Sequence, residues 1–114
     1  MSDYSKDIRI DENNLDIEWT RQASLVHKYG KLIADAMQER DKAKENLDIV
    51  RAEIDLDIRK HFKKYGLEKV TEGAITSVIA NEEDYLQALD SYNNSVHNLN
   101  VLQSAKNALE HKKK

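Results

Sequence analysis

The sequence predicts an all-α fold, in which a long helix and a shorter antiparallel helix form a coiled-coil-like helical hairpin. Two observations lead to this fold class. The chain contains no proline, and apolar residues recur at spacings of three and four, as in helices that pack lengthwise on one another. Its composition, 39% apolar and 34% charged, fits a helical assembly with a large surface per residue. We expect one helical domain over residues 1–114 that forms oligomers.

The chain is expected to begin with a flexible arm over residues 1–12, because these residues are polar and show no periodicity. Asn13 or Asn14 is a suitable N-cap for a long helix over residues 14–65. At 1.5 Å per residue this helix would be about 75 Å long, so other parts of the chain must cover it. Its expected buried row is Leu15, Trp19, Gln22, Val26, Tyr29, Ile33, Ala36, Arg40, Ala43, Leu47, Val50, Ile54, Ile58, Phe62 and Tyr65.

A bend with a short helix is expected over residues 66–81. Gly66 is the natural left-handed residue after the long helix, and Thr71 is a good N-cap for a helix ending near Ala80. The β-branched residues there leave a strand as the alternative. Asn81 then caps a second long helix over residues 82–112. The buried row of this helix is Tyr85, Leu89, Tyr92, Val96, Leu99, Leu102, Ala105 and Leu109.

Several apolar residues lie off both rows and need cover from outside one hairpin. We therefore expect self-association, because a two-helix hairpin buries only one face of each helix. The predicted interface of this homo-oligomer comprises Trp19, Leu25, Leu32, Leu56, Leu86 and Val101.

The strongest local charge lies at the end of the long helix. Five bases and one acid between residues 59 and 69 give +4, in a chain with a net charge of −3. Lysines and arginines bind phosphates and aromatic faces stack on unpaired bases, so this segment suits single-stranded nucleic acid. The simpler reading is that the bases complement the helix dipole while the aromatic residues are core. The candidate residues are Arg59, Lys60, Lys63, Lys64, Lys69, Phe62 and Tyr65.

Other chemistry is not evident. The chain has no cysteine, and His27, His61, His97 and His111 lack the spacing of metal ligands, so we expect no metal and no cofactor. Residues 82–84 are acidic, which suits a helix N-terminus better than acid–base catalysis. There is no phosphate loop or nucleophile motif, and an enzyme is not expected. No segment resembles a membrane span or a signal peptide, which makes a cytoplasmic location without a membrane partner the default.

The start of the long helix resembles the phage recombination mediator family typified by UvsY. The resemblance rests on the pattern L-x-x-E-x6-L-x-x-K-aromatic at Leu15, Glu18, Leu25, Lys28 and Tyr29. It continues in layout with a basic, aromatic bend, a T-E-G-A-I-T-S-V-I segment and an acid-started helix. The resemblance implies a ring-like oligomer that binds single-stranded DNA. It also implies help to a RecA-like recombinase in displacing single-strand-binding protein, inside the host cytoplasm if the chain is phage-encoded.

Two main hypotheses follow. The first is a non-enzymatic recombination mediator that binds single-stranded DNA and assists loading of a RecA-like recombinase. The alternative is a structural coiled-coil or adaptor protein that oligomerises and binds only protein partners. A small helical regulator that inhibits a partner is a third reading. Salt separates the first two, because phosphate binding weakens steeply as salt rises.

Overall fold

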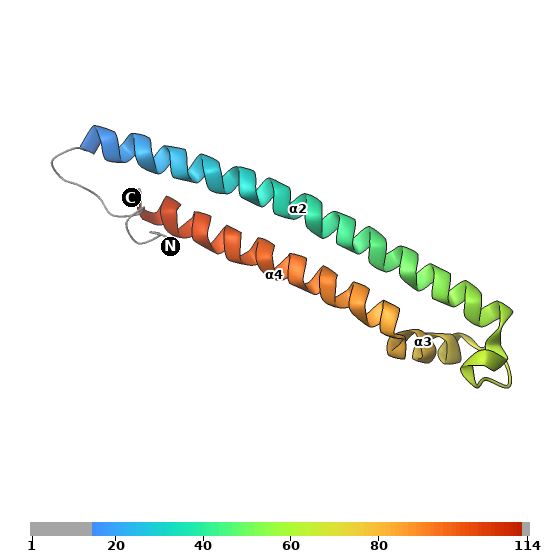
Figure 1. The fold of residues 1–114 in the computed structure, drawn as a ribbon. Coiled ribbons are helices and arrows are strands. Elements are labelled where there is room, and N and C mark those ends of the chain that lie inside the picture. The colour runs from blue at the N-terminus through green and yellow to red at the C-terminus, as the bar shows by residue number, and fades with distance from the viewer. Residues whose placement is uncertain (1–14, 113–114) are drawn as a thin grey trace. The chain divides into compact units, whose positions relative to one another are not determined.

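The computed structural model describes residues 15–112, without the side chains of residues 15–19 and 112. This part of the chain contains the α-helices α2 (Leu15–Lys60), α3 (Glu72–Asn81) and α4 (Glu83–Lys112), and the short 3-10 helix η2 (Phe62–Tyr65) (Figure 1). It contains no strand, so the all-α prediction is confirmed and the strand alternative for the short element is wrong. The predicted arm 1–12 and the caps Asn13 and Asn14 lie outside the described residues.

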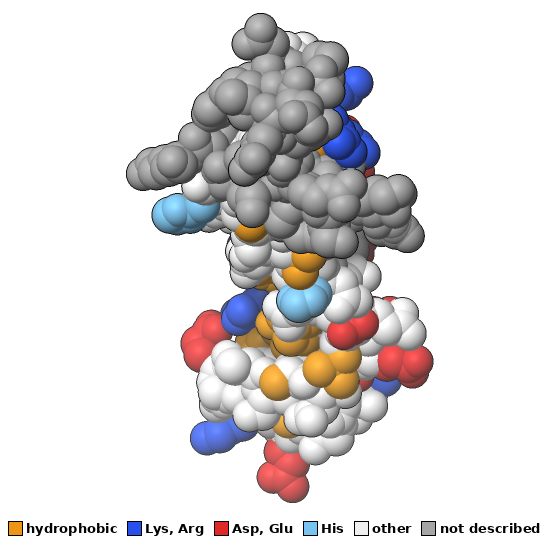
Figure 2. All heavy atoms as spheres, turned by 90° about the vertical axis from the view of Figure 1, so that its left-hand side faces the viewer, with side chains coloured by type: hydrophobic (Ala, Val, Ile, Leu, Met, Phe, Trp, Pro, Cys, Tyr) orange, Lys and Arg blue, Asp and Glu red, His pale blue; other side chains and the backbone are white. Residues whose placement is uncertain are grey.

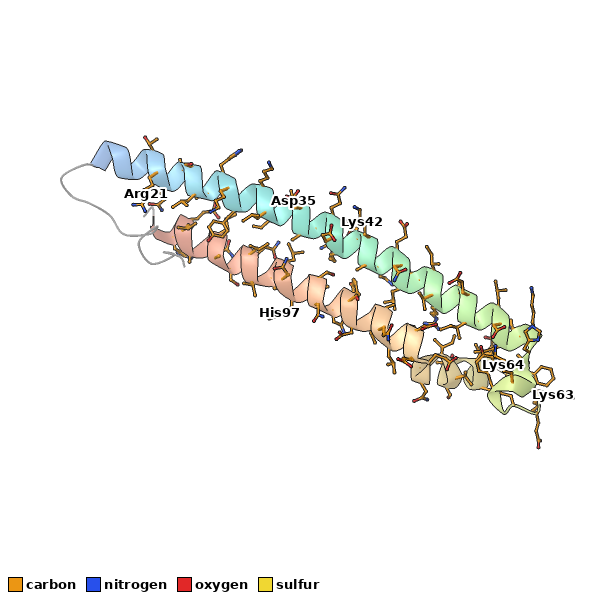
Figure 3. The ribbon with its side chains drawn as sticks, viewed as in Figure 1. Arg21, Asp35, Lys42, Lys63, Lys64 and His97 are labelled. Carbon is orange, nitrogen blue, oxygen red and sulfur yellow. The ribbon has the colours of Figure 1, made fainter. Side chains whose placement is uncertain are left out.

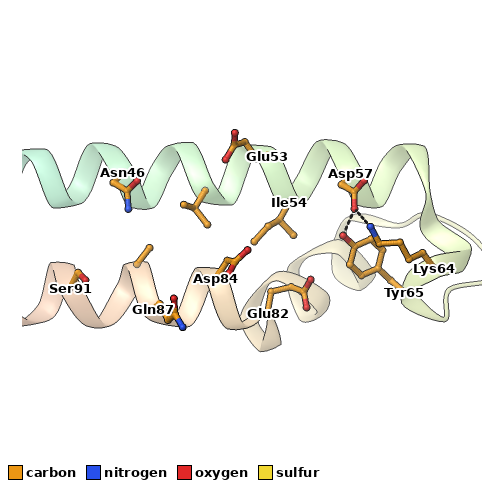
Figure 4. A pocket seen from close by; sticks show the side chains of 12 residues that line it. Asn46, Glu53, Ile54, Asp57, Lys64, Tyr65, Glu82, Asp84, Gln87 and Ser91 are labelled. Carbon is orange, nitrogen blue, oxygen red and sulfur yellow. Dashed lines mark hydrogen bonds and ion pairs between the residues drawn. The ribbon is translucent and has the colours of Figure 1, made fainter.

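The helices are shared between two compact units. The first unit consists of residues up to Gln38 and from His97 onward, and the second consists of Glu39–Val96. In the first unit, a side chain near the start of α2 bonds the last turn of α4, from Gln22 to Leu109. In the second unit, the last part of α2 and the first part of α4 run side by side in opposite directions (Figure 4). Each unit thus pairs a segment of α2 with a segment of α4.

The predicted row on α2 is the face that the structure buries. Every member from Gln22 to Tyr65 is buried or half-buried, and Ala36, Leu47 and Ile58 are fully buried. The row on α4 behaves in the same way, with Leu99 and Leu109 buried. Apolar spacing therefore predicted which faces pack. We call the α2 row from Gln22 to Ile58 the inner stripe.

The densest core lies in the second unit, where α2 meets α3. Ile58, Ile75 and Ile79 are at most 2% exposed and form one cluster. Burying each of these three isoleucines stabilises the fold by about 2 kcal/mol. The cluster therefore anchors α3 to the end of α2. Partly buried residues complete the cluster: Ile54, Tyr65, Leu67, Val70, Val78 and Tyr85.

The long α-helix ends before the predicted residue. We expected it to reach Tyr65, but it ends at Lys60, and His61 leaves helical geometry with φ −133° and ψ 49°. Residues Phe62–Tyr65 then form a 3-10 turn. The spacing of three between Phe62 and Tyr65 fits both helix types, which is why the pattern did not reveal the break.

Gly66 ends this 3-10 turn as the predicted left-handed residue, with φ 77°. Its amide donates to the carbonyl of Lys63, and the amide of Leu67 donates to the carbonyl of Phe62. This pair of bonds is a Schellman motif. The motif turns the chain towards α3.

The caps of the remaining helices follow the sequence in part. Thr71 caps α3, its side-chain oxygen accepting a hydrogen bond from the amide of Ala74 at 3.1 Å. Asn81 was expected to cap α4, but it is the last residue of α3 and its side chain donates to the carbonyl of Ser77. The short helix runs one residue further than predicted, so the capping position of α4 passes to Glu82, whose carbonyl accepts from Leu86.

Candidate nucleic-acid interface

The candidate site is the bend, which we define as residues 59–71, between the inner stripe and α3 in the second unit. Figure 3 shows Lys63 and Lys64 together at this bend. Five predicted cations belong to it, and the structure divides them into two groups. Arg59 and Lys64 form ion pairs with acids of the same unit. Lys60, Lys63 and Lys69 form none with any described residue and are exposed.

Arg59 ties the end of α2 to the start of α3. Its Nε donates to Asp55 at 2.6 Å, and its terminal nitrogen donates to both carboxylate oxygens of Glu72 at 2.9 and 3.0 Å. These hydrogen bonds, first that with Asp55 and then that with Glu72, raise the pKa of the guanidinium. Because three of its hydrogen bonds already go to carboxylates, Arg59 is less available to a phosphate than a lysine without an ion pair.

Lys64 and Tyr65 are drawn back onto α2 by a single carboxylate (Figure 4). The Lys64 ammonium donates to Asp57 at 2.9 Å, and the Tyr65 hydroxyl donates to the same oxygen. The hydrogen bond from Lys64 first, and then that from Tyr65, hold the pKa of Asp57 below its ordinary value. The same contact raises the pKa of the Tyr65 phenol. The carboxylate therefore fixes the 3-10 turn against the helix.

Two of the three unpaired lysines, Lys60 and Lys63, line a hollow with Phe62, the other aromatic residue of the bend. A shallow hollow is lined by Lys60, His61, Phe62, Lys63 and Lys64. His61 is exposed and Phe62 is half-buried, so their rings border this hollow. Cationic donors beside aromatic faces are the elements of a single-strand contact.

A second hollow in the same unit has the opposite character. It lies between α2 and α4 and contains the side chains of Glu53, Asp57, Glu82 and Asp84, with Lys64 as its one base (Figure 4). Carboxylates at this density repel phosphate. An anionic ligand would thus meet the unit on the side of the free lysines.

Tyr65 and the acids near the bend complete the comparison with the sequence. Tyr65 packs against the isoleucine cluster and donates its hydroxyl, so it serves the core. The predicted charge of +4 over residues 59–69 counted Glu68 but missed Asp55, Asp57 and Glu72. Five bases and four acids lie between residues 55 and 72, which leaves +1. Asp55 stands four residues before Arg59, a spacing that stabilises helical ion pairs and could have been recognised.

The residues predicted for self-association are mostly at the surface. Exposure is 38% for Leu32, 58% for Leu56, 47% for Leu86 and 52% for Val101, whereas Leu25 is half-buried. The side chain of Trp19 lies outside the described part. Met37 and Ile49, 39% and 50% exposed, were not predicted. Figure 2 shows a face on which hydrophobic side chains reach the surface among charged ones.

In comparisons with known proteins, no family model, curated protein or solved structure matches this chain. None of the helices in the described residues is long and apolar enough to span a membrane. Across residues 15–112, no three His, Asp or Glu side chains are grouped so that they could hold a metal ion.

Proposed function

We propose that the chain is a non-enzymatic recombination mediator that binds single-stranded DNA through the bend. In this role it assists the loading of a RecA-like recombinase on strands covered by single-strand-binding protein, in the cytoplasm. The observation that supports the proposal most is the set of exposed lysines without ion pairs to any described residue, Lys60, Lys63 and Lys69. Two of them, Lys60 and Lys63, line a hollow with Phe62 and His61.

The ion-paired cations and the unpaired lysines of the bend have different proposed roles. Arg59 and Lys64 hold the bend in place by binding Asp55, Glu72 and Asp57. Lys63 and Lys69, which form no ion pair with any described residue, then meet phosphates without first breaking such a pair, which would cost part of the binding energy. A partly exposed Phe62 offers a ring on which a base can stack, worth about 1–3 kcal/mol per base.

We further infer that α2 and α4 form a helical hairpin and that the chain self-associates. Large apolar side chains on the outer face of α2 support this, since a monomer leaves Ile49 50% and Leu56 58% exposed. Self-association also repeats the bend, and several weak contacts on one strand add to a stronger one. Because the net charge of residues 55–72 is only +1, one bend would bind a strand weakly, and several bends in one oligomer would bind it more tightly.

The test is a fluorescence anisotropy titration of labelled single-stranded DNA at low salt. We expect the parent to bind and Lys63→Gln/Lys69→Gln to bind at least about tenfold more weakly, since hydrogen bonds to charged groups contribute roughly 1.5 kcal/mol or more each. Lys60 is left unchanged because it lies four residues after the exposed Leu56, on the same face of α2. The matched control is Lys28→Gln/Lys31→Gln, two exposed lysines of α2 that form no ion pair with any described residue.

Equal losses in both variants would show that only total charge matters and would remove the bend as the site. Failure of the parent to bind at low salt would favour the second candidate, a structural coiled-coil or adaptor protein that binds only protein partners. That candidate is supported by the ion pairs of Arg59 and Lys64, which neutralise much of the bend.

A further inference from the structure

A second apolar row runs along α2 on the side opposite to the inner stripe. Its members follow each other at spacings of three or four, so they share one face of the helix. All are exposed, and the two large ones, Ile49 and Leu56, are 50% and 58% exposed. A hollow beside Ala52 opens on the same surface. We call this row the outer stripe: Glu45, Ile49, Ala52, Leu56 and Lys60.

We propose that the outer stripe is the contact between two copies of this chain, which pack antiparallel about Ala52. The proposal rests on the self-association inferred above, but it does not depend on DNA binding. In this register Ile49 of one copy faces Leu56 of the second, and Leu56 faces Ile49. The two alanines meet near the two-fold axis, where a small side chain lets the helices approach closely. Such a contact uses the same surface on both copies.

The charges at the ends of the outer stripe select the antiparallel orientation. With Ile49 opposite Leu56, the same register brings Glu45 opposite Lys60 of the second copy at both ends. Neither side chain has an ion pair with any described residue, so both are available. A parallel pair in register would instead place glutamate against glutamate and lysine against lysine. Opposite charges flanking an apolar helix contact set orientation in this way.

The proposal also explains an otherwise unfavourable feature of the helix. The inner stripe packs α2 through the opposite face, so Ile49 and Leu56, two turns apart with alanine between them, are left uncovered by the described residues. Covering them with a second copy removes about half of each side chain from water. A contact this short would be weak alone, so it fits a reversible or repeated assembly.

Cysteine cross-linking tests the orientation, because the natural chain contains no cysteine. The double variant Ile49→Cys/Leu56→Cys, which keeps the charges of Glu45 and Lys60, should give a covalent dimer under mild oxidation, detected by non-reducing electrophoresis. Each single variant should stay monomeric there. Within one helix the two positions are about 10 Å apart, too far for a disulfide inside one chain. Cross-linking by the single variants would show parallel packing, and no cross-link in the double variant would show that the stripes do not meet. Either result overturns the proposal.

A second measurement tests the face itself. Light scattering should show that Ile49→Gln/Leu56→Gln lowers the mass relative to the parent, towards the monomer mass of 13.2 kDa if no other contact persists. Leu86→Gln/Val101→Gln, the same change at two exposed sites of α4, should keep the parent mass. Loss of mass in the second variant only would move the contact to α4 and contradict the proposal. Both pairs leave the charge unchanged, so the DNA titration of these variants reports separately on the proposed function.

Discussion

The side-chain amide of Gln22 donates a hydrogen bond to the backbone carbonyl of Leu109, joining residues 87 positions apart in the first unit. The last carbonyls of a helix have no partner within the helix. Leu109 lies in the last turn of α4, so the buried glutamine, 5% exposed, satisfies one of these groups. A polar residue in an otherwise apolar row is thus a cap supplied by another helix.

Gln22→Glu should therefore lower the free energy of unfolding by about 1–3 kcal/mol at neutral pH. The carboxylate cannot donate to Leu109, and it adds a negative charge at the negative end of the α4 dipole. Urea unfolding followed by circular dichroism measures the loss. Acidification should return part of the stability to this variant, because a protonated carboxyl can donate again. Gln22→Met is the control that loses the bond without adding charge, and it should show no such recovery.

Two residues of α2 that are two positions apart should respond very differently to alanine. Ile58 is fully buried with Ile75 and Ile79, so Ile58→Ala should cost roughly 2–4 kcal/mol. Leu56 is 58% exposed, and Leu56→Ala should cost well under about 1 kcal/mol at a concentration where the chain is monomeric. Denaturant midpoints compare the two variants. Similar losses at both positions would mean that α2 does not pack through the inner stripe.

The glycines of the chain carry different constraints. Gly30 lies inside α2, and a β-carbon there would meet no atom within 4 Å. Gly30→Ala should thus stabilise the fold by up to about 1 kcal/mol. Gly66 has φ +77°, so Gly66→Ala should cost on the order of 1 kcal/mol. Thermal unfolding should move the two midpoints in opposite directions, and a destabilised Gly30→Ala would indicate that something covers this site.

Acid should release the carboxylate that holds the bend. The pKa of Asp57 is lower in the folded chain than its ordinary value near 3.8. Its contribution to stability is therefore complete above that value and is lost as the pH falls through the folded-state pKa. The side chain is 34% exposed, so solvent weakens the effect. The difference in unfolding free energy between the parent and Asp57→Asn should shrink as the pH falls below about 4, through the folded-state pKa of Asp57. A constant difference would mean that the Lys64 and Tyr65 contacts do not depend on the charge.

Periodicity predicted the helices and their buried faces because both follow from local spacing. The stripe from Gln22 to Ile58, the Gly66 turn and the Thr71 cap all express preferences that act within a few residues. Arg59 binds Glu72, which lies 13 residues away in the sequence, and Lys64 binds Asp57, which lies 7 residues away. These contacts depend on where α2 ends and how η2 turns, and neither is encoded in a repeat.

The candidate site shows the same division. Sequence composition identified the basic segment, since charge density needs no geometry. It could not separate Lys63 from Lys64, two adjacent residues of one type, of which only the second meets an acid. Which lysine is available to a ligand is decided by the 3-10 turn.

The most direct test of the account is the salt dependence of single-strand binding by two double variants. Arg59→Gln/Lys64→Gln removes the paired cations, and Lys63→Gln/Lys69→Gln removes the free ones. We predict that the second variant flattens the slope of log affinity against log salt by about 1.4, or 0.7 for each lost phosphate contact, while the first keeps the parent slope and loses stability. A flatter slope in the Arg59→Gln/Lys64→Gln variant, with the other unchanged, would contradict the assignment.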